Sequence, residues 1–172
     1  LWSTSWRNLL TTRSVSPSDI EKEMKRALDF LKNHVEIAFA TCEGNRPRIR
    51  VFQIMKMEGT TLYFATSPVK KVFRQLHDKP FVEIMASEGK EFVKVSGKAD
   101  FDVDVETQKW IYDNNPVLPR LYTSFDMLAY FKVEIEEMDH YDLEPTPPVF
   151  KHYNLNDNTV NDGYVGERYS KK

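Results

Sequence analysis

The stretch RPRIRVFQIMKMEGTTLYFATSPVKKVFRQL, residues 46–76, decides the fold. Its first part predicts two strands, at 48–57 and 61–66, because polar and apolar residues alternate and a Glu-Gly turn separates them. A Ser-Pro pair then introduces a short helix, which we expect over 68–77 because its apolar residues recur at helical spacing. A strand, a turn, a strand and a helix in this order predict a β-rich unit with helices at its connections.

Segments of strand length also flank this stretch, and they bring the expected number of strands to about six. The flanking strands are expected at 35–41, 80–86, 91–102 and 129–141. Amphipathic helices are expected at 16–33 and 104–114, since apolar residues recur there every three or four positions. Short strands in meander order, without regular βαβ alternation, favour a barrel over a doubly wound sheet. We therefore predict a mainly β fold with α: an antiparallel barrel of about six strands with peripheral helices.

Composition divides the chain into one domain and two extensions. Residues 1–15 are polar and have no signal-peptide pattern, so we treat them as an N-terminal extension before the domain at 16–143. Prolines and asparagines become frequent in residues 144–172, the C-terminal extension, as they do in flexible tails. Three aromatic residues of this extension are expected to pack against the barrel or a partner subunit: Phe150, Tyr153 and Tyr164.

The charge balance excludes several classes of partner. The 172 residues contain 24 Lys and Arg against 26 Asp and Glu, so the net charge of -2 provides no field that would attract nucleic acid. The apolar runs are only a handful of residues long, which predicts no membrane span. Any anion that binds must therefore be held by a local cluster of cations.

The single cysteine, Cys42, indicates a reducing compartment, and we expect the protein to be cytoplasmic. Its place at the end of an apolar strand favours a small buried thiol over a nucleophile. The histidines have no companion Cys or carboxylate at the spacing of metal ligands, so no metal site is expected. They are His34, His77, His140 and His152.

Cations occur at two places in the deciding stretch, its first strand and the junction where its helix starts. Arg48 and Arg50 fall on one face of a strand, and Lys70 and Lys71 fall in the first turn of the helix. A helix N-terminus carries partial positive charge, so each lysine there is unfavourable by about 0.3–1 kcal/mol unless an anion offsets it. Two hydroxyl groups at this junction would complete a phosphate site, those of Thr66 and Ser67. The alternative is that all of these charged side chains extend into water.

The order of the segments resembles the pyridoxamine 5'-phosphate oxidase-like family of FMN-binding split β-barrels. Each segment alone is a weak signal, whereas five in this order with similar spacing are specific. They are IAFAT (37–41), RPRIRVF (46–52), LYFATS (62–67), KKVFRQL (70–76) and VKVSGKA (93–99). The resemblance covers roughly residues 20–142, and it implies that the domain is an FMN-binding split β-barrel.

The resemblance also implies an FMN site on the deciding stretch. In the family, the strand arginine and the helix lysines hold the FMN phosphate, and the strand that carries the arginine lies along the isoalloxazine ring. The cofactor-binding residues implied here are Arg48, Arg50, Val51, Phe52, Gln53, Thr66, Ser67, Lys70, Lys71 and Gln75. The family builds its flavin sites at a dimer interface, which implies a homodimer, and Gln75 is a candidate to reach the other subunit's flavin.

The chain departs from the pyridoxamine oxidases themselves near its C-terminus. Those enzymes end in a segment with an Arg-x-His pair that holds the substrate, whereas His140, His152 and Arg168 stand apart here. No side chain stands out as an acid, base or nucleophile, which fits chemistry that belongs to a flavin. We therefore expect an FMN-dependent oxidoreductase that acts on an unidentified small molecule. The alternatives are a flavin or haem carrier or sensor without turnover, and a deazaflavin-dependent reductase.

Overall fold

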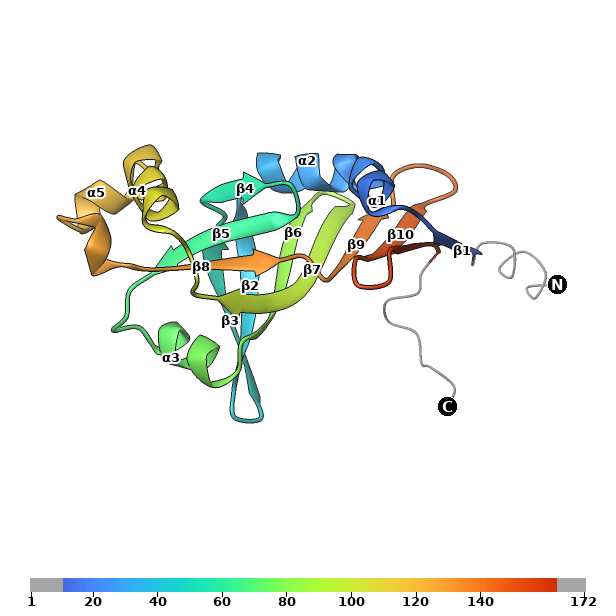
Figure 1. The fold of residues 1–172 in the computed structure, drawn as a ribbon. Coiled ribbons are helices and arrows are strands. Elements are labelled where there is room, and N and C mark those ends of the chain that lie inside the picture. Colours follow the sequence, from blue (N-terminus) through green and yellow to red (C-terminus); the bar gives the residue numbers. More distant parts are fainter. Residues whose placement is uncertain (1–10, 164–172) are drawn as a thin grey trace. The chain divides into compact units, whose positions relative to one another are not determined.

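The computed structural model describes residues 11–163, and its strands are antiparallel (Figure 1). Eleven strands are described: β1 (Thr11–Ser14), β2 (Glu36–Glu43), β3 (Arg46–Gln53), β4 (Lys56–Glu58), β5 (Thr61–Thr66), β6 (Phe81–Glu88), β7 (Glu91–Asp100), β8 (Ala129–Glu134), β9 (Glu137–Asp142), β10 (Val149–Asn154) and β11 (Thr159–Asp162). The helices are α1 (Pro17–Glu23), α2 (Lys25–Asn33), α3 (Lys71–Asp78), α4 (Val105–Asn114), α5 (Leu118–Leu121) and the 3-10 helix η2 (Phe125–Met127). The mainly β class with antiparallel strands and added helices is therefore confirmed.

The number of strands predicted from the sequence is too low. Hydrogen bonds join the strands in the order β1-β11-β10-β9-β7-β6-β2-β3, with β5 paired to β4 and β8, and β8 paired to β7. This order ends at β1 and β3, so the sheet is not closed. The strand expected at 129–141 is two strands, because 129–134 pairs with β5 whereas 137–142 pairs with β10. The strand expected at 48–57 also divides, because β3 pairs with β2 and β4 pairs with β5.

The helix expected at 16–33 is also divided. Ser16 caps α1, since its Oγ accepts a hydrogen bond of 3.2 Å from the Asp19 backbone N–H, and Pro17 takes the first helical position. Met24 separates α1 from α2, with a ψ of -8°. The predicted apolar stripe is nevertheless buried as expected: Ile20, Met24, Ala27, Leu28 and Leu31.

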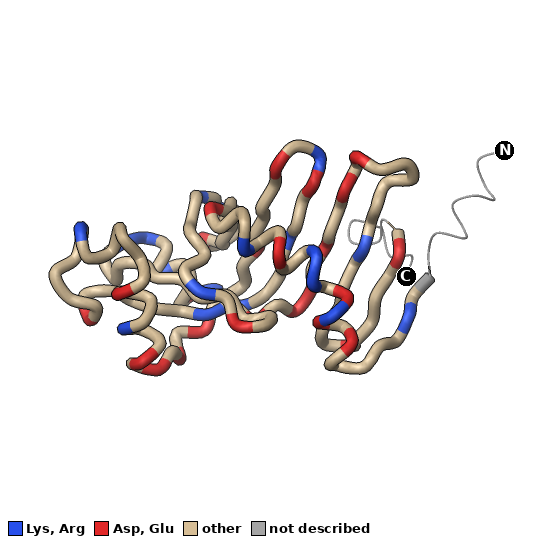
Figure 2. The backbone as a smooth tube through the Cα atoms, turned by 90° about the horizontal axis from the view of Figure 1, so that it is seen from above, with Lys and Arg blue, Asp and Glu red and all other residues tan. Residues whose placement is uncertain are grey.

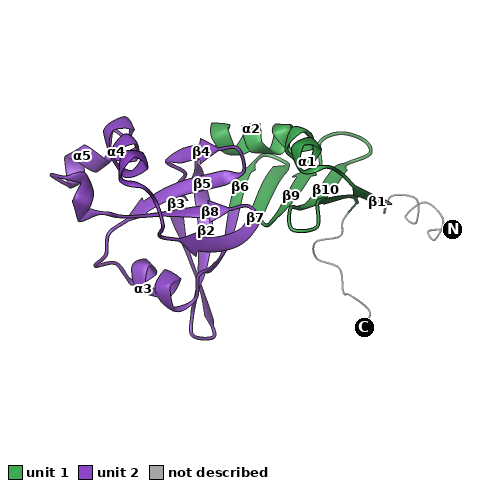
Figure 3. Cartoon of the chain, in the orientation of Figure 1, with its two compact units in different colours: residues 1–34, 85–95, 136–172 green, residues 35–84, 96–135 purple. Residues whose placement is uncertain are grey.

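The chain forms two compact units, which are coloured separately in Figure 3. Unit 2 consists of residues 35–84 and 96–135 and contains the deciding stretch. Its core is aromatic: Phe39, Phe64 and Phe131 are fully buried, and the rings of Phe64 and Phe131 stack at 5.2 Å between centroids. A smaller core joins α4, α5 and β8, and it consists of Val103, Ile111, Leu118, Leu128 and Tyr130.

Unit 1 takes the remaining described residues, 11–34, 85–95 and 136–163. It includes the hairpin of β10 and β11, which lies in the C-terminal extension that was expected to pack through its aromatic residues. Tyr153 in β10 is 1% exposed and Val160 in β11 is fully buried, so this hairpin contributes core residues. Of the three aromatic residues expected to pack, Tyr153 does so, Phe150 lies against Tyr141, and Tyr164 lies outside the described residues.

Basic and acidic residues alternate along the chain without forming long blocks of one sign (Figure 2). This distribution agrees with the near balance of 24 basic and 26 acidic residues. Within residues 11–163, no helix has both the length and the hydropathy needed to cross a membrane.

Candidate functional site

Strand β3 places Arg50 and Phe52 on one face and Ile49 and Val51 on the other. Arg50 lies opposite Phe39 of β2, and Phe52 packs against Phe39 with 4.9 Å between ring centroids. Ile49 and Val51 alternate with them and are 73% and 72% exposed. An arginine is therefore held on the same face as the aromatic core, while two aliphatic side chains face outward.

The Arg50 guanidinium is fixed by neutral acceptors. Its Nη1 donates to Thr41 Oγ1 at 2.7 Å and to the Phe39 carbonyl at 3.3 Å. Its Nη2 donates to Gln75 Oε1 at 2.8 Å, and the same oxygen accepts the Thr41 hydroxyl at 2.6 Å. These contacts join β2, β3 and α3, so they set the position of Arg50 before any ligand binds.

Gln75 extends this network to a carboxylate. Its Nε2 donates to Glu43 Oε2 at 2.8 Å, and Arg48 Nη2 donates to Glu43 Oε1 at 2.9 Å. The hydrogen bond from Arg48, followed by that from Gln75, lowers the pKa of Glu43. Glu43 is thus ionised and forms its ion pair with Arg48. It is therefore not a counterion for Arg50.

Arg50 carries a partly buried charge that has no counterion in the described chain. Among residues 11–163, no Asp or Glu forms an ion pair with Arg50, and burial lowers the pKa of its guanidinium. An arginine nevertheless remains protonated in proteins. Because a buried charge is unfavourable unless it is paired, this arrangement favours an anion beside Arg50.

The helix next to Arg50 begins later than the sequence predicted. Helix α3 starts at Lys71 with Lys70 as its N-cap, and no side chain caps it. Ser67 and Pro68, expected to be the N-cap and first helical residue, lie in the preceding turn, where Ser67 Oγ accepts from the Val69 N–H at 3.4 Å. The Lys70 N–H donates to the Ser67 carbonyl at 3.1 Å, so residues 67–70 form a turn and the helix begins after it. Both lysines are exposed at the uncapped end of the helix, where an anion is favoured.

The strand, the network and the helix start enclose a pocket of about 510 Å³. Seven of the ten residues predicted from the sequence line it: Arg48, Arg50, Val51, Phe52, Lys70, Lys71 and Gln75. The pocket combines cations from β3 and α3 with apolar side chains from β3. Such a lining suits a ligand that is flat and apolar at one end and anionic at the other.

The other three predicted residues do not line this pocket. Gln53 Oε1 accepts from Asn115 Nδ2 at 3.1 Å, which ties the end of β3 to the segment after α4. Ser67 serves the turn before α3. Thr66 is 3% exposed, and its Oγ1 has no hydrogen-bond partner among the described residues. A buried hydroxyl without a partner is unfavourable, so Thr66 retains a donor for a ligand or a water molecule.

Sequence reasoning missed Thr41 and Glu43. Both lie on β2. Thr41 contacts Arg50 and Glu43 contacts Arg48, and both also contact Gln75 through the docking of α3 against that strand. Their spacing in the sequence gives no sign of this docking. Only the pairing of β2 with β3, in which Thr41 lies opposite Arg48, would have placed Thr41 near the arginines.

Comparison with known proteins rests on solved structures, because no protein-family model and no curated protein sequence matches the chain. A NimC/NimA family protein from Clostridium acetobutylicum is 29% identical, with a TM-score of 0.58 over 73% of this chain and 87% of that one. A pyridoxamine 5'-phosphate oxidase-related, FMN-binding protein from Nostoc punctiforme is 16% identical, with a TM-score of 0.61 over 88% and 98% of the two chains.

A haem-binding protein from Mycobacterium smegmatis shares the fold as well. It is 11% identical, with a TM-score of 0.59, over 85% of this chain and 61% of that one. The structural neighbours are thus pyridoxamine 5'-phosphate oxidase-related proteins and their relatives, and they match the family that the sequence resembles. The relationship expected from the five segments is confirmed at the level of the fold.

Proposed function

We propose that this protein binds FMN in the pocket between β3 and α3 and is an oxidoreductase that acts on a small molecule. The observation that carries the proposal is Arg50, whose partly buried charge has no counterion among the described residues and lies in one pocket with Lys70 and Lys71. An FMN phosphate would supply the missing negative charge. The name of the Nostoc neighbour, an FMN-binding protein, supports the same cofactor.

The residues of the pocket suit the two ends of FMN. Arg50, Lys70 and Lys71 would hold the phosphate, by charge-assisted hydrogen bonds. Val51 and Phe52 would flank the isoalloxazine ring, since both line the same pocket from β3. When bound, the flavin supplies transfer of one or two electrons, and the protein supplies binding, orientation and exclusion of water.

Haem is the main alternative, because the Mycobacterium smegmatis neighbour is a haem-binding protein. Haem iron is usually held by His, Cys, Met or Tyr. None of these residue types lines the pocket that contains Arg50, whereas four cationic side chains do. The lining therefore favours FMN. A deazaflavin also has a flat ring, so its distinction from FMN rests on the spectrum of the bound cofactor.

We further propose that the protein is a homodimer. Ile49 and Val51 on β3 and Phe81 on β6 are 73%, 72% and 58% exposed. Both strands are neighbours of β2 in the sheet, so these apolar side chains extend over adjacent strands. A second copy of the chain would cover them and, as in the family that the sequence resembles, complete the flavin site. The lone cysteine fits a cytoplasmic location, which we propose as well.

The spectrum of the purified protein tests the cofactor. We expect the two visible absorption bands of an oxidised flavin, which bleach on addition of dithionite. Bleaching by NADH or NADPH would support an oxidoreductase over a carrier. A Soret band, or a deazaflavin spectrum, would contradict FMN, and a protein that binds no added FMN would contradict the proposal altogether.

A further inference from the structure

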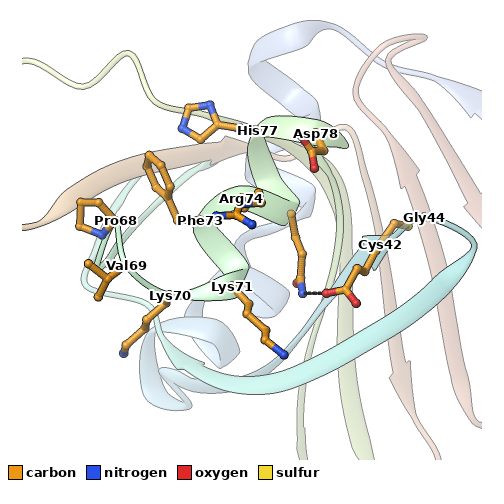
Figure 4. A pocket seen from close by; sticks show the side chains of 12 residues that line it. Cys42, Gly44, Pro68, Val69, Lys70, Lys71, Phe73, Arg74, His77 and Asp78 are labelled. Carbon is orange, nitrogen blue, oxygen red and sulfur yellow. Dashed lines mark hydrogen bonds between the residues drawn. The ribbon is translucent and has the colours of Figure 1, made fainter.

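A second pocket, of about 630 Å³, lies beside the first (Figure 4). It is lined by α3, by the turn that precedes it, and by Cys42, Glu43 and Gly44 at the end of the β2–β3 hairpin. The two pockets share Glu43, Lys70, Lys71 and Gln75, and they do not share the apolar β3 side chains. They therefore meet at the cationic end of the first pocket.

The second pocket is itself cationic. Lys70, Lys71 and Arg74 are exposed, and none of them forms an ion pair within residues 11–163. Of the two acidic residues in the lining, Glu43 is already engaged by Arg48, which leaves only Asp78 against three cations. In Figure 4, Arg74 lies between the two lysines and the side chains of Phe73 and His77. The positive charge thus continues from the first pocket along α3.

Aromatic rings line the far part of the second pocket. The His77 ring stacks on Phe101 at 4.3 Å between centroids with an interplanar angle of 11°. Phe73 contacts both rings edge to face, at 4.3 Å and 5.4 Å. His77 is exposed, so its imidazole is accessible to a planar ligand. Aromatic side chains with nearby cations are typical partners of nucleobases.

We propose that the flavin site accepts FAD, with the adenosine phosphate half of the molecule in the second pocket. This inference rests on the proposed flavin function. The two pockets meet at the residues assigned to the FMN phosphate, so a ligand that fills both must continue beyond that phosphate. FAD is the flavin that does so: its second phosphate would meet Arg74, and its adenine would stack on His77.

The volume and chemistry agree with this assignment. Nucleotide-sized ligands occupy pockets of about 300–1,000 Å³, and this pocket falls within that range. A second inorganic phosphate would use the cations but not the rings. A nicotinamide dinucleotide would use both, but it has no isoalloxazine ring for the first pocket. FAD uses the apolar part of the first pocket, the shared cations and the rings of the second.

The test is calorimetric titration of FMN, FAD and riboflavin into flavin-free protein. FAD should bind the parent at least as tightly as FMN. Arg74→Ala should weaken FAD about tenfold and change FMN less than twofold, because a charge-assisted hydrogen bond to the second phosphate is lost. His77→Ala should have the same selective effect through lost stacking. Arg120→Ala, which removes an exposed arginine from α5, is the matched control and should change neither affinity.

The outcomes separate this inference from the proposed function. FMN that binds while FAD binds at least tenfold more weakly would overturn the extension and leave the FMN site intact. Equal losses of FMN and FAD in Arg74→Ala would also overturn it, because Arg74 would then act on the shared phosphate. If neither flavin binds, the proposed function fails and the extension fails with it.

Discussion

Arg50 Nη2 donates a hydrogen bond of 2.8 Å to Gln75 Oε1, and this contact joins strand β3 to helix α3. Gln75 is 5% exposed, and its oxygen also accepts the Thr41 hydroxyl. A neutral amide therefore orients the arginine without neutralising it. The charge of Arg50 therefore remains available to a ligand. A carboxylate at position 75 would neutralise this charge.

Gln75→Glu tests this role of the amide. A carboxylate at this position would pair with Arg50 and compete with an FMN phosphate, while riboflavin, which has no phosphate, would be little affected. We expect FMN affinity to fall by about tenfold or more, since a hydrogen bond to a charged group contributes about 1.5–3 kcal/mol. Fluorescence titration of both flavins measures the ratio of FMN affinity to riboflavin affinity. Gln108→Glu on α4 is the control, and equal losses of FMN and riboflavin would contradict the mechanism.

The phosphate site is tested by removing its cations one at a time. Arg50→Ala and Lys71→Ala should each weaken FMN by roughly one to two decades, with Arg50→Ala at least as severe, and should leave riboflavin nearly unchanged. Added salt should weaken FMN in the parent more than in the variants, because it screens the charges that the variants lack. Lys32→Ala on α2 is the control. An unchanged ratio of FMN to riboflavin affinity would place the phosphate elsewhere.

The homodimer is tested on β6, away from both pockets. Phe81 is 58% exposed, and Phe81→Glu would place a charge in an apolar interface. Light scattering should give twice the chain mass of 20.2 kDa for the parent and 20.2 kDa for the variant at micromolar concentration. Val105→Glu on α4, where Val105 is 53% exposed, is the matched control and should remain dimeric. A parent that is a monomer with flavin bound would refute the proposed dimer.

The charged residues of the pocket could be predicted because they lie close together in the sequence, within residues 46–76. Alternation placed Arg48 and Arg50 on one face, and both line the pocket with Lys70 and Lys71. The predicted start of α3 was wrong because Ser67 lies in the turn before the helix and does not cap it. Serine is common in turns as well as at helix N-caps, so the sequence alone did not separate the two. The contacts of Thr41 and Glu43 with Gln75 were not predictable, since they depend on how α3 docks against β2.

The C-terminal hairpin was missed for a different reason. Prolines and asparagines in the segment after residue 143 indicate a loop, and its alternation is short. Strand β11 pairs with β1, which lies at the other end of the described chain, and β10 lies between β11 and β9, so that Tyr153 and Val160 are buried. Long-range pairing of this kind overrides local composition.

Tyr153 measures how much this hairpin contributes to stability. Its side chain is 1% exposed, and its hydroxyl donates to the Glu23 carbonyl at the end of α1, at 3.1 Å. Tyr153→Ala should lower the free energy of unfolding by about 3–5 kcal/mol, and Tyr153→Phe by about 1 kcal/mol through loss of the hydrogen bond. Urea unfolding measures both. Phe150→Ala, which truncates a half-exposed ring of the same strand, should cost clearly less, and an equal cost would contradict a core role for Tyr153.

His152 in the same hairpin should make stability depend on pH. Its Nδ1 lies 2.5 Å from Asp139 Oδ1, and this hydrogen bond raises the pKa of the imidazole above its ordinary value of 6.5, although burial opposes the shift. Folding therefore favours the protonated form, so the contribution of His152 to stability is complete below pH 6.5 and is lost as the pH rises through the raised pKa.

At pH 6 His152→Gln should be less stable than the parent by about 1.5–3 kcal/mol in urea unfolding. This difference should shrink by pH 9, where the imidazole is neutral in both folded and unfolded parent. Asp139→Asn removes the main partner and should reduce the pH dependence, while Glu137 still raises the pKa of His152. A difference between parent and His152→Gln that stays constant from pH 6 to 9 would show that the imidazole is not protonated in the fold.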